Sequence, residues 1–134
     1  MPIRCGWGDD QQTLYIFQFM GYWTWEDLHQ AAENIGDLLD NAPHPINLIF
    51  NFADSFRVPR NGINELSQIA RKLLNNLNMM ILVGMDPSMQ MVSQTVLNMH
   101  PRLKSRVHTC CTFAEAMKFL EEVTTAQYDR ASCQ

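Results

Sequence analysis

The segment Met79–Val83 (Met-Met-Ile-Leu-Val) constrains the fold of this chain more than any other stretch. Five consecutive apolar residues are typical of a strand that is buried on both faces, as the central strands of parallel sheets are. The longest strongly apolar run, Met79–Met85, is far shorter than the ~20 residues that a membrane-spanning helix needs. We therefore expect a central strand with parallel neighbours, and no membrane span.

Four more strands are expected, three before this segment and one after it. Alternating apolar residues or β-branched residues mark each of them, and the first two form a hairpin around a polar turn. Their ranges are Ile3–Trp7, Thr13–Met20, Ile46–Phe52 and Arg106–Cys111. A loop over Ala53–Arg60 follows the third of them.

Apolar residues at helical spacing predict four helices between these strands. Thr24, Asp86 and Thr112 are the expected N-caps of the first, third and fourth helices. The first helix ends near Asn41, the second carries apolar residues from Ile63 to Leu77, the third stops at His100 and the fourth ends at Val123.

This alternation of strands and helices predicts an α/β fold. Residues 1–123 are expected to form one domain, a mixed and mostly parallel sheet of about five strands with four helices. Residues 124–134 are expected to form a polar C-terminal tail.

Composition and motifs exclude several classes of function. The net charge of −4, without a basic block, argues against nucleic-acid binding. No C-x-x-C spacing, G-x-S-x-G elbow or P-loop occurs, so catalytic, cofactor and metal sites are each predicted to be none. Four cysteines without a disulfide pattern, and a start without an apolar signal segment, predict a cytoplasmic protein with reduced thiols.

Two groups of side chains suggest binding instead of catalysis. Tyr22, Trp23 and Trp25 are three large aromatics within four residues, more than one helix start needs, and they predict an exposed patch for a homodimer or a ligand. Nine methionines could line a ligand groove, but five of them fall on positions predicted to face the core: Met79, Met80, Met89, Met99 and Met117.

The stretch Phe50–Gly62 resembles the corresponding stretch of STAS domains, the sulfate-transporter and anti-sigma-factor-antagonist modules. In that family a strand ends in Asp and a D-S-[ST]-G motif opens the next helix. Here Asn51 takes the place of the Asp, and Pro59–Gly62 (Pro-Arg-Asn-Gly) takes the place of the motif, of which the glycine is kept. The order of strands and helices agrees from about Thr13 to Val123.

The resemblance implies a regulatory, protein-binding module of the STAS-like fold. In bacterial antagonists the motif carries a Ser or Thr that a partner kinase phosphorylates. Arg60 stands at that position here, so the resemblance implies a module without this phospho-acceptor. The expected partner-binding residues are Ser55, Arg57, Arg60, Asn61 and Gly62, because the two arginines could pair with carboxylates of a partner.

Two other functions stay open from the residues alone. One is a carrier of a small apolar or lipid-like ligand, which needs a pocket between sheet and helices. The other is an enzyme, which needs polar side chains that converge in one cleft. The prediction is a non-catalytic regulatory protein with a protein partner.

Overall fold

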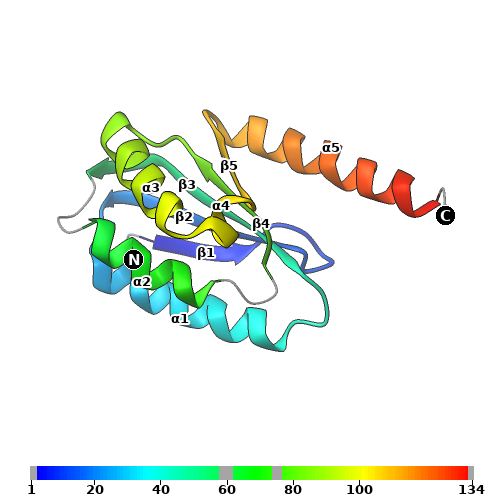
Figure 1. Cartoon of the computed structure of the whole chain (residues 1–134), viewed down its shortest axis with the longest axis horizontal. Coiled ribbons are helices and arrows are strands. Elements are labelled where there is room, and N and C mark those ends of the chain that lie inside the picture. Colours follow the sequence, from blue (N-terminus) through cyan, green and yellow to red (C-terminus); the bar gives the residue numbers. More distant parts are fainter. Residues whose placement is uncertain (1–2, 58–61, 74–76, 133–134) are drawn as a thin grey trace.

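Strand β4 (Leu77–Val83) lies in the interior of a five-stranded sheet, parallel to β3 (Ile46–Arg57) on one side and to β5 (Val107–Cys110) on the other. The computed structural model describes residues 3–57, 62–73 and 77–132 (Figure 1). The position of β4 confirms the prediction made from its unbroken apolar run.

The strand order is β1-β2-β3-β4-β5. β1 (Ile3–Trp7) runs antiparallel to β2 (Leu14–Tyr22), and every other neighbouring pair is parallel. The predicted fold class, an α/β domain with a mixed and mostly parallel sheet of five strands, is therefore confirmed.

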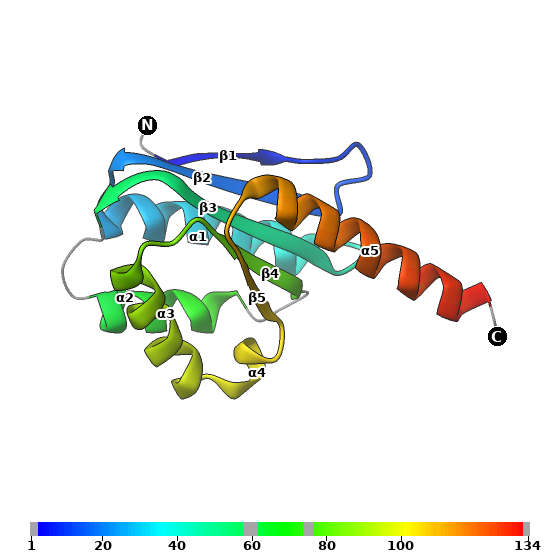
Figure 2. The same ribbon diagram turned by 90° about the horizontal axis from the view of Figure 1, so that it is seen from above.

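Helices cover both faces of the sheet (Figure 2). Four of them pack on one face: α1 (Trp25–Asn41), α2 (Gly62–Lys72), α3 (Pro87–Met99) and the short α4 (Pro101–Lys104). The fifth, α5 (Phe113–Ser132), packs on the other face through Ala116 and Leu120. Successive residues of β3 serve both layers, since Leu48 and Phe50 face the first four helices and Ile49 faces α5.

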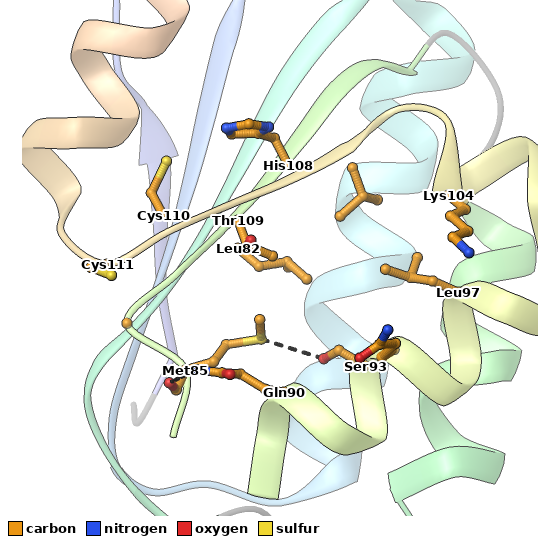
Figure 3. Close-up of a pocket in the computed structure, with 13 residues that line it drawn as sticks. Leu82, Met85, Gln90, Ser93, Leu97, Lys104, His108, Thr109, Cys110 and Cys111 are labelled. Atoms are coloured by element: carbon orange, nitrogen blue, oxygen red, sulfur yellow. Dashed lines mark hydrogen bonds between the residues drawn. The ribbon is translucent and has the colours of Figure 1, made fainter. Parts of the chain in front are cut away.

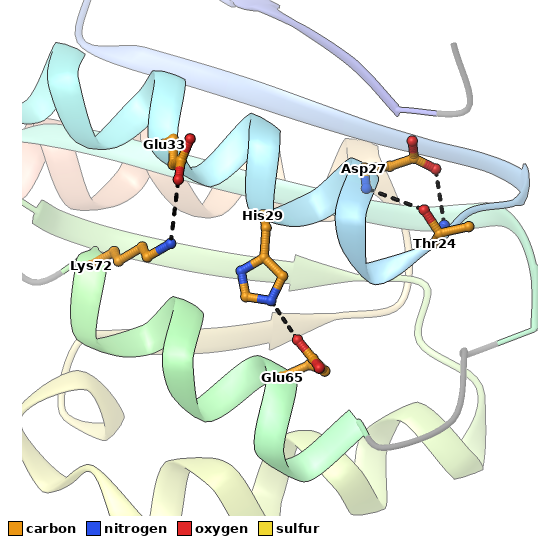
Figure 4. A network of polar contacts seen from close by, with 6 residues as sticks. All are labelled: Thr24, Asp27, His29, Glu33, Glu65 and Lys72. Carbon is orange, nitrogen blue, oxygen red and sulfur yellow. Dashed lines mark hydrogen bonds and ion pairs between the residues drawn. The ribbon is translucent and has the colours of Figure 1, made fainter.

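Side-chain caps set the starts of three helices where the sequence predicts them. The Thr24 hydroxyl accepts the Asp27 N–H at 3.2 Å, and the Asp27 carboxylate accepts the Thr24 N–H at 3.0 Å (Figure 4). Asp86 accepts the Met89 N–H at 2.7 Å ahead of α3, and Thr112 accepts the Glu115 N–H at 3.2 Å at the start of α5. Each cap satisfies an N–H that the first turn leaves without a helical partner.

Asp9 fixes the β1–β2 hairpin in a similar way. Its carboxylate accepts the N–H groups of Thr13 at 2.9 Å and Leu14 at 3.2 Å, together with the Thr13 hydroxyl. Burial acts to raise the pKa of Asp9, but the hydrogen bonds from Thr13, Leu14 and Gln12 outweigh it and lower the pKa below its ordinary value. The charged form of Asp9 therefore stabilises the turn.

Several predicted boundaries are wrong. Strand β3 continues past Phe52 to Arg57, because β2 also continues and pairs with it as far as Tyr22. Helix α4 is an extra short helix after α3. The last predicted helix, expected to end at Val123, continues as α5 to Ser132, since residues 124–132 contain no Gly or Pro that would end it.

Two apolar residues also lie elsewhere than predicted. Leu77 begins β4 and is not part of the second helix. Met99 is exposed, whereas Met89 and Val96 on the same helix are buried. At 3.6 residues per turn Met99 points roughly 80° away from Met89, which is off the buried face.

Candidate functional site

The parallel strands β2 and β3 end on the side of the molecule where α2 begins. In open α/β sheets, the surface beyond the carboxyl ends of the strands is the usual place for binding. Here β2 ends at Tyr22, β3 ends at Arg57, and α2 begins at Gly62 (left in Figures 1 and 2). We call this region the carboxyl-end surface and define it by Tyr22, Ser55, Gly62, Ile63 and Asp86.

Strand β3 reaches this surface through two irregularities in its pairing with β2. Gln18 pairs with Asn51 but Met20 pairs with Asp54, so β3 carries one extra residue between these pairs. The Asn51 side-chain oxygen accepts the Ala53 N–H at 3.0 Å and satisfies a donor within this bulge. A second shift follows Gly21, which pairs with Ser55. The end of β3 is therefore a bulged strand where the sequence predicts a loop.

Trp23 anchors Ser55 to the core. The Trp23 indole N–H donates to the Ser55 hydroxyl at 2.9 Å, and the Trp23 ring lies 5.0 Å from the centres of Phe19 and of Trp25. Only 3% of Trp23 is exposed. The prediction that Trp23 belongs to an exposed patch is therefore wrong, because its ring fills the core and its N–H needs a buried partner.

Of the three predicted patch aromatics, Tyr22 is the exposed one. It is 74% exposed, while Trp25 is partly buried against the core. Ile63, in the first turn of α2, is also 41% exposed. Its spacing suggests a core position, but it lies at the helix end, beyond the packed part of the sheet. Tyr22 and Ile63 are thus the two exposed apolar side chains of the carboxyl-end surface as defined above. Self-association through Tyr22 stays a prediction.

A small cavity of about 200 Å³ lies between the end of β3 and the turn that follows β4. Ser55 and Asp86 line it, together with Phe52, Ala53, Gly84 and Met89. Gly84 has a φ of +67°, and a Cβ atom on it would lie 3.0 Å from the Ala53 backbone. Glycine therefore lets the two chain segments approach and sets the shape of the cavity.

The five predicted partner-binding residues are described to different extents. Ser55 lines the cavity, and Gly62 is the buried first residue of α2. The backbone of Arg57 is the last of β3, paired with Tyr22. Arg60 and Asn61 lie outside the described residues. The sequence analysis did not identify Tyr22 and Ile63 as neighbours of this region, because their closeness depends on the extended pairing of β2 with β3.

Polar contacts between helices hold α2 in place. His29 of α1 contacts the Glu65 carboxylate of α2, and Lys72 lies 3.9 Å from the Glu33 carboxylate (Figure 4). On the other side of α2, the Ser67 hydroxyl lies 2.7 Å from His100 Nε2. These contacts link α2, from its first turn to its last residue, to α1 and to His100, the C-cap of α3.

The Ser67–His100 pair has the chemical form of a nucleophile and base, but its setting is structural. Ser67 is 8% exposed, packs between helices and does not line the cavity at the strand ends.

The cysteine and metal-ligand chemistry of the described residues is also limited. Burial first, and then Glu115 and Cys111, raise the pKa of the Cys110 thiol, so this thiol stays protonated at neutral pH. Within the described ranges, no cluster of three His, Cys, Asp or Glu could hold a metal ion.

An apolar cavity between the sheet and helices α2 and α3 has a volume of only about 50 Å³. Phe50, Ile69, Met80 and Leu103 are among its lining residues. Pockets for drug-sized ligands measure roughly 300–1,000 Å³, so this cavity is too small for a lipid-like ligand. None of the helices in the described part of the chain is both long and apolar enough to cross a membrane.

Comparisons with known proteins identify the fold. No protein-family model and no curated protein matches the chain. The similar solved structures include the anti-sigma factor antagonist SpoIIAA in its unphosphorylated form, and the Bacillus cell fate determinant SpoIIAA in the phosphorylated form. The first structure has a TM-score of 0.64 and 15% sequence identity, and the match covers 90% of this chain and 96% of that one. The second has a TM-score of 0.63 and 16% sequence identity, and the match covers 88% of this chain and 98% of that one. The chain has the STAS-like fold.

Proposed function

We propose that this protein is a non-catalytic regulatory module that binds a protein partner through the carboxyl-end surface. The fold is shared with an anti-sigma factor antagonist, whose name describes action on another protein. The observation that carries the proposal is the pair of exposed apolar side chains, Tyr22 and Ile63, at the end where β2 and β3 finish and α2 begins.

The composition of this surface suits a protein partner. Exposed aromatic and aliphatic side chains beside polar groups are typical of the central part of a protein interface. Ser55 and Asp86 supply polar groups at the same end of the sheet, where both line one cavity. In the sequence, Arg57 ends β3 and Arg60 follows it before α2. Arginine can pair with a carboxylate of the partner through two hydrogen bonds.

We infer that binding is not switched by phosphorylation at the start of α2. The segment from Arg57 to Asn64 contains no Ser, Thr or Tyr, and Arg60 stands where the resemblance to STAS domains places the acceptor. Ser55, the nearest described hydroxyl, already accepts the Trp23 N–H.

The experiment compares Arg60→Glu with wild type and with a matched variant, Arg71→Glu, an exposed arginine in the last turn of α2. Each protein is used as bait in extract from the native cells, and its melting temperature is measured. Arg60→Glu is expected to lose the protein that wild type and Arg71→Glu retain, while its unfolding free energy changes by less than ~0.5 kcal/mol. Equal capture by all three proteins, or an unfolded Arg60→Glu, would contradict the proposal.

A further inference from the structure

Strand β5 leaves one edge of the sheet open. Because β5 is the last strand in the sheet order, only one side of its backbone pairs with another strand in the part of the chain that the structure describes. Met80 N–H donates to the Arg106 carbonyl at 2.9 Å, and Gly84 N–H donates to the Cys110 carbonyl at 3.1 Å. Peptide groups alternate in direction along a strand, so those of Val107 and Thr109 point away from β4. The open edge thus offers backbone donors and acceptors at Val107 and Thr109.

A cleft of about 730 Å³ runs beside this edge, between β5 and α3 (Figure 3). Val107 and Thr109 line it on the β5 side, and Leu97 and Gln94 line it on the α3 side. Lys104 lies at the end beside α4 (Figure 3). Neighbouring strands are about 4.8 Å apart, so a sixth strand would lie at that distance beyond β5 and beside the cleft, which its side chains would enter.

Lys104 is the lysine among the described residues that line the cleft, and no Arg, Asp or Glu is among them. The lining is therefore locally positive, although the net charge of the protein is −4. The nearest acid along β5 is Glu115, whose carboxylate accepts the Cys111 N–H at 3.2 Å beyond the end of the strand. The Lys104 ammonium donates to Asn98 at 2.7 Å and lies at the surface.

We propose that the open edge of β5 and its cleft bind an extended acidic segment of a partner protein, which adds to the sheet as a sixth strand. Main-chain hydrogen bonds to Val107 and Thr109 hold the segment, and Lys104 attracts its carboxylates. Apolar side chains of the segment lie against Leu97 and Val107. This surface lies along the edge of β5, whereas the carboxyl-end surface lies where β2 and β3 end; Gly84 lines both the cleft and the small cavity beside Ser55.

Charge also selects against other occupants. A second copy of this chain would pair antiparallel about a two-fold axis, and its own cleft lining supplies no carboxylate for Lys104. A nucleic acid could answer the charge but offers no strand edge to pair with Val107 and Thr109. The acidic extended peptide is the occupant that satisfies both the backbone and the charge.

The test uses three synthetic eight-residue peptides and the full-length protein. One alternates Glu with Val, the second alternates Lys with Val, and the third is the Glu-Val peptide with its alternate backbone nitrogens methylated. Binding is followed by fluorescence anisotropy and by the amide NMR signals of the protein. The Glu-Val peptide is expected to bind, and to slow hydrogen exchange at the Val107 and Thr109 amides. The other two peptides are expected to bind at least tenfold more weakly.

Variants test the charge and the backbone separately. Lys104→Glu is expected to weaken binding of the Glu-Val peptide about fivefold, a typical effect of losing one exposed ion pair, while Arg71→Glu on α2 leaves it unchanged. Thr109→Pro removes an outward N–H and is expected to abolish binding, whereas Thr109→Val keeps it.

Four results would overturn the proposal. They are equal binding of the methylated peptide, equal binding of the Lys-Val peptide, equal binding of single-stranded oligothymidine, and no binding of the Glu-Val peptide at millimolar concentration. If Thr109→Pro fails to fold, the methylated peptide still decides whether the backbone of the edge is used.

Discussion

Replacing Gly84 with alanine tests whether the turn after β4 is held tightly against β3. The φ of Gly84 is +67°, a conformation that costs a residue with a Cβ atom about 1 kcal/mol. The new methyl group would also lie 3.0 Å from both the Cα and N atoms of Ala53, and these backbone atoms must move to admit it. Overpacking of this kind costs about 1–3 kcal/mol.

Together these effects predict that Gly84→Ala lowers the unfolding free energy by about 2–4 kcal/mol. For a chain of this size the melting temperature falls by about 10 °C. The matched control is Gly36→Ala within helix α1, where a Cβ atom would meet no atom closer than 4.0 Å. This change is expected to stabilise the protein by about 0.5–1 kcal/mol. Urea unfolding followed by circular dichroism measures both, and an unchanged or more stable Gly84→Ala would refute the reasoning.

Two further predictions concern a turn and a modification. Asp9→Ala is expected to destabilise the protein by about 1–2 kcal/mol at neutral pH, because three hydrogen-bond donors lose their acceptor. The folded state lowers the pKa of Asp9, so this stabilisation is complete above pH 3.8, the ordinary pKa of the group, and is lost as the pH falls through the lowered pKa. The unfolding free energies of wild type and Asp9→Ala should therefore converge in acid. A difference between them that stays constant with pH would argue against a role of the charged form. An anti-sigma-type kinase is expected to add no phosphate between Arg57 and Asn64, and a phosphate mapped there by mass spectrometry would disprove this.

The sequence predicts the sheet well because burial leaves a periodic pattern. The apolar run Met79–Val83 specifies a central parallel strand, and the three cap residues specify where α1, α3 and α5 begin. These signals are local: each depends on neighbouring residues and on the period of the element. They are enough to identify the order of strands and helices along the chain and the fold class.

The site could be predicted only in part, because its geometry depends on pairing between distant segments. The bulges of β3 arise from its register with β2, which no local pattern specifies. The same pairing places Tyr22 beside the end of β3, and it lets Trp23 turn into the core to meet Ser55. Aromatic composition alone does not distinguish the buried Trp23 from the exposed Tyr22.

Site-specific photo-crosslinking in the native cells tests the proposed partner-binding surface most directly. A benzoylphenylalanine replaces Tyr22 or Ile63 on the carboxyl-end surface. In the control protein it replaces Met99, the last residue of α3, which is 58% exposed and lies at the end of the helix away from Asp86. The proposal predicts that positions 22 and 63 crosslink to one and the same protein, which Arg60→Glu no longer captures, and that position 99 does not. Crosslinking of that protein with equal yield from position 99, or no shared protein at positions 22 and 63, would contradict it.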